Sequence, residues 1–356
     1  MMSFTTQSVR EHLEQIEAET LSPLASLSAN SRGRNSRKPK HELCSIRPIY
    51  QHDRDRIVHS KAFRRLGDKT QVFLSPKGSH YSNRLTHTLE VSQIARTVAR
   101  ALSLNESLTE AIAVGHDLGH TPFGHAGERA LNKLVSGGFR HERQSLRVAD
   151  LIAKSGKGLN LSWEVRNGIV LHSKGRGSIF SPHYFPATLE GEIVRLSDII
   201  AYLNHDIDDA VRGGFLDKTT VPFAESIGVR SAARINKMVR DLIETSFVAL
   251  ADGEKHLAVS EKMQHIINEL RDFMFERVYN APEIRKEFDK SEKIITFLFT
   301  YFVEYPDQLS KYYSPLVSDH LERNITDFLA SLTDSYAIEL YTKLFIPARV
   351  QYPEFI

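Results

Sequence analysis

The chain has a single cysteine, Cys44, among its 356 residues. One thiol cannot form an intrachain disulfide, and it cannot supply the several sulfur ligands of a zinc-finger or iron–sulfur site. Any metal that this protein holds must therefore be bound by histidine and carboxylate side chains. The lack of disulfides is typical of a reducing compartment, so we expect a cytoplasmic protein.

Long apolar runs and an excess of one charge are also missing. No segment approaches the roughly 18 apolar residues that cross a bilayer, and the first residues do not resemble a secretory signal. Forty-six Lys and Arg against 44 Asp and Glu give a net charge of +2, so no overall field favours nucleic acid or membrane. With 41% hydrophobic residues, the composition is that of a soluble globular protein with a sizeable core and no membrane partner.

The spacing of apolar residues is helical through most of the chain, which predicts an all-α protein with at most a short β-hairpin, near residues 70–74. The predicted helices cover residues 6–21, 50–66, 83–102, 105–117, 125–135, 141–152, 162–171, 189–212, 231–250, 260–279, 291–305 and 318–345. We divide the chain into an N-terminal helix with a basic linker (1–47), a core (48–224) and a C-terminal helical lobe (225–356). We expect the lobe to complete the same globular unit.

Residues 26–40 are rich in Ser and Asn and contain five Lys or Arg side chains. Such a stretch is typical of a solvated linker. It is also compatible with a basic arm that contacts phosphate, either on a nucleic acid or on a nucleotide in a neighbouring subunit.

Residues 115–125 hold three of the 16 histidines, together with Asp117, Pro122 and three glycines. His116 and Asp117 end one predicted helix, and Pro122 and Gly124 turn the chain before the next, so the stretch is a corner between two helices. Histidine and carboxylate at this density suggest a metal or phosphate site. A His-Asp pair alone is common, however, and a histidine-rich turn satisfied by its own hydrogen bonds is the alternative.

Two further polar side chains lie on apolar faces of predicted helices. His87 lies on the inward stripe of the helix at 83–102, with Arg84 one turn earlier, and Asp198 lies in an apolar part of the helix at 189–212. A buried ionised group needs a partner. His87, His116, Asp117 and Asp198 therefore form a candidate metal site with mixed nitrogen and oxygen ligands, which suits Mn, Mg, Fe, Co, Ni or Zn and predicts metal-assisted hydrolysis.

The order His87, His116-Asp117, Asp198 resembles the H…HD…D signature of the HD-domain phosphohydrolases. Longer motifs narrow the resemblance to the deoxyguanosine triphosphate triphosphohydrolase family. These motifs lie at residues 53–60, 62–66, 69–73, 83–91, 115–127 and 332–337, and the resemblance covers roughly residues 48–350. It implies an HD-domain fold for the predicted core.

The resemblance also implies roles for individual residues. The family's metal ligands match His87, His116, Asp117 and Asp198, and the arginine matching Arg84 contacts the triphosphate. His120, His125 and His141 match residues around the α-phosphate. His125 matches the proton-transferring group and is oriented by Glu128, where some members have Asp. Gln71, Tyr202 and Asp206 match positions that bind the 3′-hydroxyl and exclude a 2′-hydroxyl. Lys174 and Arg176, in a basic loop, are further candidate phosphate contacts.

The predicted reaction is metal-dependent attack of water on the α-phosphorus of a deoxynucleoside triphosphate (dNTP), which releases deoxynucleoside and tripolyphosphate. An HD enzyme acting on a nucleoside monophosphate or a cyclic nucleotide is the first alternative. A binding protein that senses nucleotides or single-stranded DNA is the second. The resemblance further implies a homo-oligomer, such as a tetramer or hexamer, with a nucleotide or single-stranded DNA as effector.

Overall fold

The computed structural model describes residues 8–34, 43–73, 81–173, 185–314 and 320–347. This part of the chain forms no strand, and its two isolated bridges join Arg34 to Ser162 and Thr70 to Asn83. The α-helices are α1 (Val9–Thr20), α2 (Ile49–Val58), α3 (Lys61–Arg65), α4 (Arg84–Ala101), α5 (Glu106–Gly115), α6 (His125–Leu134), α7 (His141–Arg147), α8 (Trp163–Leu171), α9 (Leu189–Arg212), α10 (Ala224–Ile227), α11 (Ser231–Ala251), α12 (Glu261–Met274), α13 (Pro282–Glu304), α14 (Pro306–Leu309), α15 (Leu321–Ser331) and α16 (Asp334–Phe345). The predicted all-α class is confirmed.

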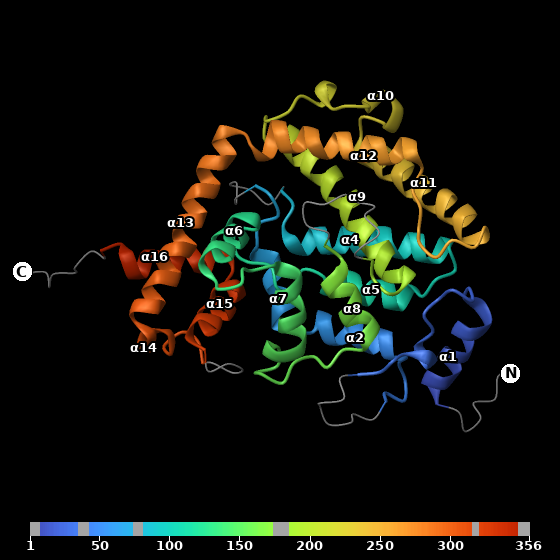
Figure 1. The fold of residues 1–356 in the computed structure, drawn as a ribbon, viewed down its shortest axis with the longest axis horizontal. Helices are drawn as coiled ribbons and strands as arrows, with labels where there is room; N and C mark the ends of the chain where they lie inside the picture. The colour runs from blue at the N-terminus through green and yellow to red at the C-terminus, as the bar shows by residue number, and fades with distance from the viewer. Residues whose placement is uncertain (1–7, 35–42, 74–80, 174–184, 315–319, 348–356) are drawn as a thin grey trace, which may run out of the picture.

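Helix α5 lies at the centre of the molecule, where α2, α4, α8 and α9 pack around it (Figure 1). Its sequence suits this place, because Leu108, Ala111 and Ile112 are fully buried small or branched side chains. Helix α9 is buried along most of its length. The helices that carry His87, His116 and Asp198 therefore converge in one core.

Two asparagines begin the helices that lead to the candidate site. The Asn83 side chain accepts a hydrogen bond from Thr86 N at 2.9 Å and caps α4. The Asn105 side chain accepts from Ser107 N and Leu108 N, each at 3.1 Å, and caps α5. Both caps satisfy N–H groups that have no partner within their helix.

The prediction of a single helix over residues 50–66 is wrong, because the structure has two helices there, α2 and α3. Ser60 accepts a hydrogen bond from Phe63 N at 3.1 Å and starts a new helix there. A serine that bonds to the backbone in this way competes with continuation of the preceding helix. Gly67 lies in a 3-10 turn at Leu66–Asp68 and does not end a long helix.

The predicted hairpin and the long C-terminal helix also differ from the structure. Thr70 forms only an isolated bridge with Asn83, and its backbone N–H donates to the side chain of Asp334. Residues 70–73 therefore form no β-ladder. Leu74 lies outside the described residues. The predicted helix at 318–345 is interrupted where the Thr333 side chain accepts from Tyr336 N and starts α16.

Residues 26–34 are not a solvated linker. Arg34 forms an ion pair with the buried Asp53 and donates to the carbonyl of Asn160 at 2.6 Å. Ser31 donates to Glu164 at 2.7 Å, which ties the same segment to the start of α8. The rest of the basic stretch, residues 35–40, lies outside the described residues.

The C-terminal helices cover two different parts of the core. Helices α11 and α12 pack on α9, whereas α13 packs on α6 and also contacts α15 and α16 (Figure 1). The C-terminal region therefore reaches the corner that follows α5. None of the described helices has the length and apolar character that crossing a membrane requires.

Candidate active site

The corner between α5 and α6 has an unusual backbone. Helix α5 ends at Gly115 with His116 as its C-cap, and α6 begins at His125. Between them, Phe123 and Gly124 have φ values of +61° and +56°. Left-handed backbone is unfavourable for a residue with a side chain, so the surroundings must hold Phe123 in place. The end of α5 thereby carries the buried His116, and the start of α6 carries the exposed His125.

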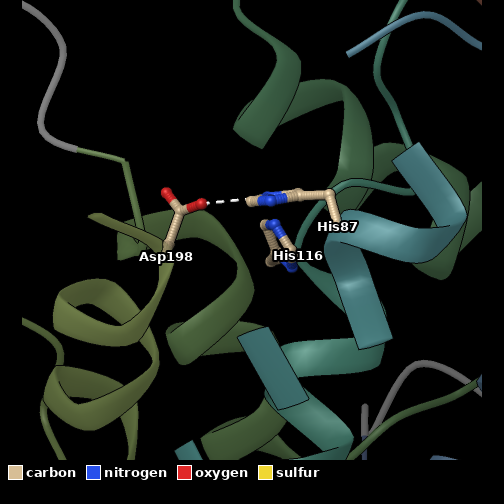
Figure 2. Close-up of side chains that lie close together, drawn as sticks. All are labelled: His87, His116 and Asp198. Atoms are coloured by element: carbon tan, nitrogen blue, oxygen red, sulfur yellow. Dashed lines mark ion pairs between the residues drawn. The ribbon is translucent and has the colours of Figure 1, made fainter. Parts of the chain in front are cut away.

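His87, His116 and Asp198 meet as predicted from their helix faces. One ligand atom from each lies within 4.8 Å of the others. The closest pair is His87 Nε2 and Asp198 Oδ1, 3.0 Å apart. Figure 2 shows the three side chains pointing toward one another from α4, the end of α5 and α9. Two imidazoles and a carboxylate at this spacing could hold a divalent metal ion.

His116 carries the best evidence that this group fits a metal. Its Nδ1 donates to the carbonyl of Ala113 at 2.6 Å, so in the neutral ring Nε2 carries no hydrogen atom. That Nε2 is buried and has no hydrogen-bond partner in the structure. Metal-ligating histidines typically donate one ring nitrogen to a carbonyl and present the other to the ion. An unpartnered buried acceptor is costly unless something binds it.

His87 is held in a similar way. Its Nδ1 lies 3.0 Å from His205 Nε2 while its Nε2 faces Asp198. Burial lowers the pKa of His87 even though Asp198 opposes the shift, so the imidazole is neutral, the form that binds metals. Burial would raise the pKa of Asp198, but its hydrogen bond with His87 and the neighbouring histidines together hold that pKa below the ordinary value.

Asp117 lies beside this trio and pairs with Arg84. The guanidinium donates to Asp117 Oδ2 at 2.6 Å, while Oδ1 is 3.6 Å from His116 Nε2. Burial would raise the pKa of Asp117, but the neighbouring His116 and Arg84 hold it well below the ordinary value. Nε and Nη2 of Arg84 are buried without a partner. Arg84 is therefore positioned to bind an anion next to the possible metal ligands.

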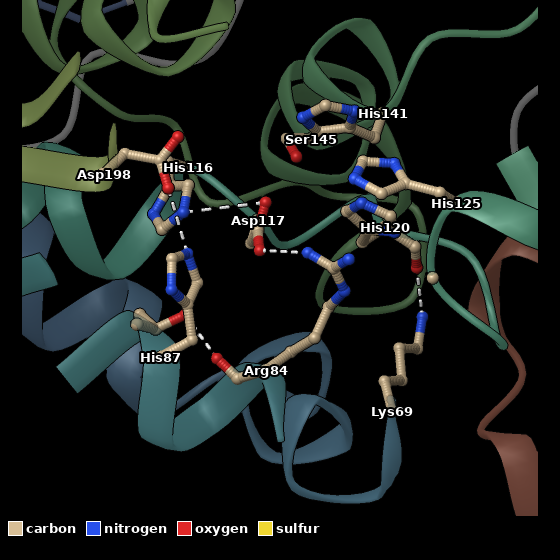
Figure 3. Close-up of polar contacts among 12 residues, drawn as sticks. Lys69, Arg84, His87, His116, Asp117, His120, His125, His141, Ser145 and Asp198 are labelled. Atoms are coloured by element: carbon tan, nitrogen blue, oxygen red, sulfur yellow. Dashed lines mark hydrogen bonds and ion pairs between the residues drawn. The ribbon is translucent and has the colours of Figure 1, made fainter. Parts of the chain in front are cut away.

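His125, Glu128 and His141 form a second group beyond the corner (Figure 3 labels the two histidines). Glu128 accepts from His141 Nδ1 at 3.0 Å and lies 3.5 Å from His125 Nδ1. Burial would lower the pKa of His141, but the charge of Glu128 raises it to about 9. Burial would raise the pKa of Glu128, but its contacts with His141 and His125 together hold that pKa below the ordinary value. The His125 side chain is 66% exposed, so it is open to a ligand.

His120 lies between the two groups. It is buried, and its ring stacks on His141 with centroids 4.7 Å apart. Burial and then the charge of Arg84 hold the pKa of His120 well below the ordinary value, so the ring is neutral. Its Nδ1 has no hydrogen-bond partner. A neutral imidazole beside Arg84 can accept a proton or donate a hydrogen bond to a phosphate oxygen.

The predicted sugar-binding residues come from two segments of the chain. Tyr202 and Asp206 lie on α9, one and two turns beyond Asp198, and Asp206 accepts from the Tyr279 hydroxyl at 2.5 Å. Gln71 is buried with an unpartnered Oε1, and its backbone lies against Gly124 at the corner. Lys174 and Arg176 fall outside the described residues.

Sequence reasoning missed His172, which the structure places beside His116 with ring centroids 4.9 Å apart. Its Nδ1 donates to the carbonyl of Ile169 at 2.7 Å, and its Nε2 lies 3.3 Å from His141 Nε2. Burial and the neighbouring histidines lower the pKa of His172 to about 3. It is therefore a neutral acceptor for the charged His141. The feature of the sequence that could have identified His172 is its position at the end of a helix, because it is the C-cap of α8 just as His116 is the C-cap of α5.

Two regions of the chain match models of known protein families. The HD domain model matches residues 84–203, and the phosphohydrolase-associated domain model matches residues 257–343. A deoxyguanosinetriphosphate triphosphohydrolase-like protein of Caldanaerobacter subterraneus is 49% identical over 343 residues, which is 96% of each chain. A protein with the same description in Desulfatibacillum aliphaticivorans is 47% identical over 95% of this chain and 98% of its own. One in Clostridium tetani is 39% identical over 99% of this chain and 100% of its own.

Proposed function

Because the chain belongs to the deoxyguanosinetriphosphate triphosphohydrolase-like family of HD-domain hydrolases, we propose that it cleaves deoxynucleoside triphosphates into deoxynucleoside and tripolyphosphate. The observation that carries this proposal is the position of Arg84. Its unpartnered guanidinium nitrogens lie between a trio that could hold a metal and a set of histidines that could transfer a proton. A phosphate bound there would be within reach of both groups.

His87, His116, Asp117 and Asp198 would hold the divalent metal ion. When bound, the ion would draw charge from a phosphoryl oxygen and lower the pKa of a bound water. Arg84 would bind the same phosphate through its free nitrogens and so neutralise charge that develops in the transition state. Asp117 would keep the guanidinium oriented through their 2.6 Å hydrogen bond.

Loss of the 5′-oxygen of the nucleoside requires an acid, because an alkoxide is a poor leaving group. We assign this proton to His125, which is exposed and lies 3.5 Å from Glu128. His141 remains charged at neutral pH and would place that positive charge beside the α-phosphate. His120 would line the same phosphate. Histidine is the side chain whose ordinary pKa suits these tasks near pH 7.

Gln71, Tyr202 and Asp206 would bind the sugar. The amide and the carboxylate would take the 3′-hydroxyl, and the ring of Tyr202 would leave no space for a 2′-hydroxyl. The buried, unpartnered Gln71 Oε1 supports this role, because such an acceptor is costly unless a ligand donates to it.

The reaction is tested by incubating the protein with each dNTP and NTP in the presence of Mn²⁺ or Mg²⁺ and separating the products by ion-exchange chromatography. We expect tripolyphosphate and deoxynucleoside from dNTPs and little turnover of NTPs. Pyrophosphate or free phosphate would instead indicate another HD phosphohydrolase activity. Binding of nucleotide or single-stranded DNA without turnover would indicate a sensing protein.

A pair of histidine variants tests the assignment of the acid. His125→Ala should retain metal and lose turnover, because only the proton donor is removed. His265→Ala, on the exposed face of α12, should hydrolyse dNTPs at the native rate. Native turnover by His125→Ala would contradict the assignment.

A further inference from the structure

A carboxylate from the C-terminal region joins two segments of the candidate active site. Asp334, the first residue of α16, is 5% exposed. Its Oδ1 accepts the backbone N–H of Phe123 at 2.8 Å, and its Oδ2 accepts that of Thr70 at 2.9 Å. Phe123 belongs to the corner, and Thr70 precedes Gln71. One side chain therefore fixes both segments relative to each other.

Lys69 makes the complementary connection. It is 2% exposed, and its Nζ donates to the carbonyl of His120 (Figure 3). The same Nζ donates to the carbonyl of Ala330 at 2.8 Å. Among the described residues, no carboxylate lies within ion-pair distance of this ammonium group. Burial lowers the pKa of Lys69 to about 7, and its Nζ is stabilised here by donating to two backbone carbonyls. The lysine thereby joins the corner to the end of α15, three residues before Thr333.

The two side chains hold the corner at two points, His120 and Phe123. Lys69 binds the carbonyl of His120, and Asp334 binds the N–H of Phe123, whose φ of +61° needs external support. Gly124 allows the corner to lie close to the backbone of Gln71, because a Cβ at position 124 would lie only 3.1 Å from the Gln71 carbonyl oxygen. His120 lies within this held segment, and His125 follows it directly.

We propose that Asp334 is a positioning residue that sets the corner carrying His120 and His125, and that this is what the C-terminal region contributes to the active site. The proposal rests on the proposed function, in which these histidines act on the α-phosphate. Asp334 touches no reacting atom; it acts through the backbone of Phe123 and Thr70. Sequence motifs alone left residues 332–337 without a role.

The test compares Asp334→Asn with Thr333→Ala. An asparagine has one side-chain oxygen, so it can accept only one of the two N–H groups and places its own NH₂ against the other. Thr333→Ala removes the N-cap of the same helix, where its side chain accepts from Tyr336 N at 3.3 Å, and leaves both corner bonds intact. The two variants therefore both disturb the start of α16, but only one disturbs the corner.

We expect kcat for dNTP hydrolysis to fall about 100-fold in Asp334→Asn, as a shift of about 1 Å in catalytic groups can cause. KM and metal content should stay within about twofold of the native values, and Thr333→Ala should keep its kcat. Hydrogen exchange followed by mass spectrometry should show faster exchange in peptides covering residues 118–126 only in Asp334→Asn.

Two results would overturn the proposal. One is unchanged exchange at residues 118–126 in Asp334→Asn, which needs no activity to observe. The other is faster exchange there with a kcat equal to that of Thr333→Ala. If the native protein hydrolysed a different phosphoester, the proposed function would fail, and the same kcat comparison on that substrate would still decide the role of Asp334.

Discussion

Arg84 donates one guanidinium N–H to Asp117 Oδ2 over 2.6 Å, and both side chains are almost completely buried. The pair leaves two nitrogens of the same guanidinium without a partner. Asp117 thus orients Arg84 and still leaves donors free for a ligand. The geometry suits a bidentate contact with phosphate, which a lysine could not reproduce.

Arg84→Lys should raise KM for dNTPs at least about tenfold, because one ammonium group cannot serve both Asp117 and a phosphate. Steady-state kinetics at fixed metal concentration would measure this. Arg96→Lys is the matched control, since Arg96 lies on the outer face of the same helix, with its side chain 42% exposed and paired with Glu106. Equal KM values for the two variants would show that Arg84 does not bind the substrate.

Asp198→Asn should weaken metal binding by more than about tenfold, because a carboxamide is a poorer ligand than a carboxylate and His87 loses its charged partner. Isothermal titration calorimetry of the chelator-treated protein with Mn²⁺ would measure the affinity. Asp272→Asn removes an exposed carboxylate from α12 and should bind metal as the native protein does. Native affinity in Asp198→Asn would place the metal elsewhere.

The His141–Glu128 pair should make stability depend on pH. Burial alone would lower the pKa of His141, but Glu128 raises it to about 9, whereas the unfolded chain titrates near the ordinary value of 6.5. The contribution of the pair is therefore complete below about pH 6.5 and is lost as the pH rises through 9. Glu128 is ionised in both states over this range, because its folded pKa lies below its ordinary value of 4.5.

Urea unfolding of the metal-free protein at pH 6 and at pH 9 would test this dependence. From pH 6 to pH 9, the free energy of unfolding of the native protein should fall by about 3 kcal/mol more than that of the Glu128→Gln variant. The reason is that the pKa of His141 returns toward its ordinary value in the variant. Parallel pH profiles for the two proteins would mean that the pair is not charged in the folded state.

Gly124→Ala should reduce both stability and activity. An added Cβ would lie 3.1 Å from the Gln71 carbonyl oxygen, 3.2 Å from that of Thr70 and 3.3 Å from Arg84 Nη2. The control is Gly137→Ala, which has a positive φ of +82° and no atom within 4 Å of its new Cβ. Gly137→Ala should lower the free energy of unfolding by about 1 kcal/mol, because it adds backbone strain and no steric contact. Gly124→Ala should lose more stability in urea unfolding and should also lose kcat, which Gly137→Ala retains.

Local features of the sequence predicted much of the helical fold. The caps at Asn83 and Asn105 involve partners within three residues, so the pattern that predicts them is contained in a short window. The bounds of α9 agree with its prediction for a related reason, because a long apolar stripe and the N-cap Thr188 define it. The break at Ser60 was missed because a serine N-cap competes with an otherwise continuous helical pattern.

The meeting of His87, His116 and Asp198 also followed from helix faces, because buried polar side chains on helices of one core need shared partners. The sequence motifs by themselves determined the all-α class, the family and the inward direction of these side chains. They did not determine which distant groups would satisfy the remaining polar atoms. Arg34 pairs with Asp53 and binds the carbonyl of Asn160, which no local pattern indicates.

Only the tertiary structure decided the places of His172, Lys69 and Asp334. Each makes the contact that matters here with residues far along the chain: His172 with His141, Lys69 with two carbonyls, and Asp334 with two backbone N–H groups. Backbone partners carry no sequence signature, because every residue except proline offers the same N–H and carbonyl. The residues of the candidate site could therefore be proposed from the sequence, whereas the groups that hold its corner appear only when the helices are packed.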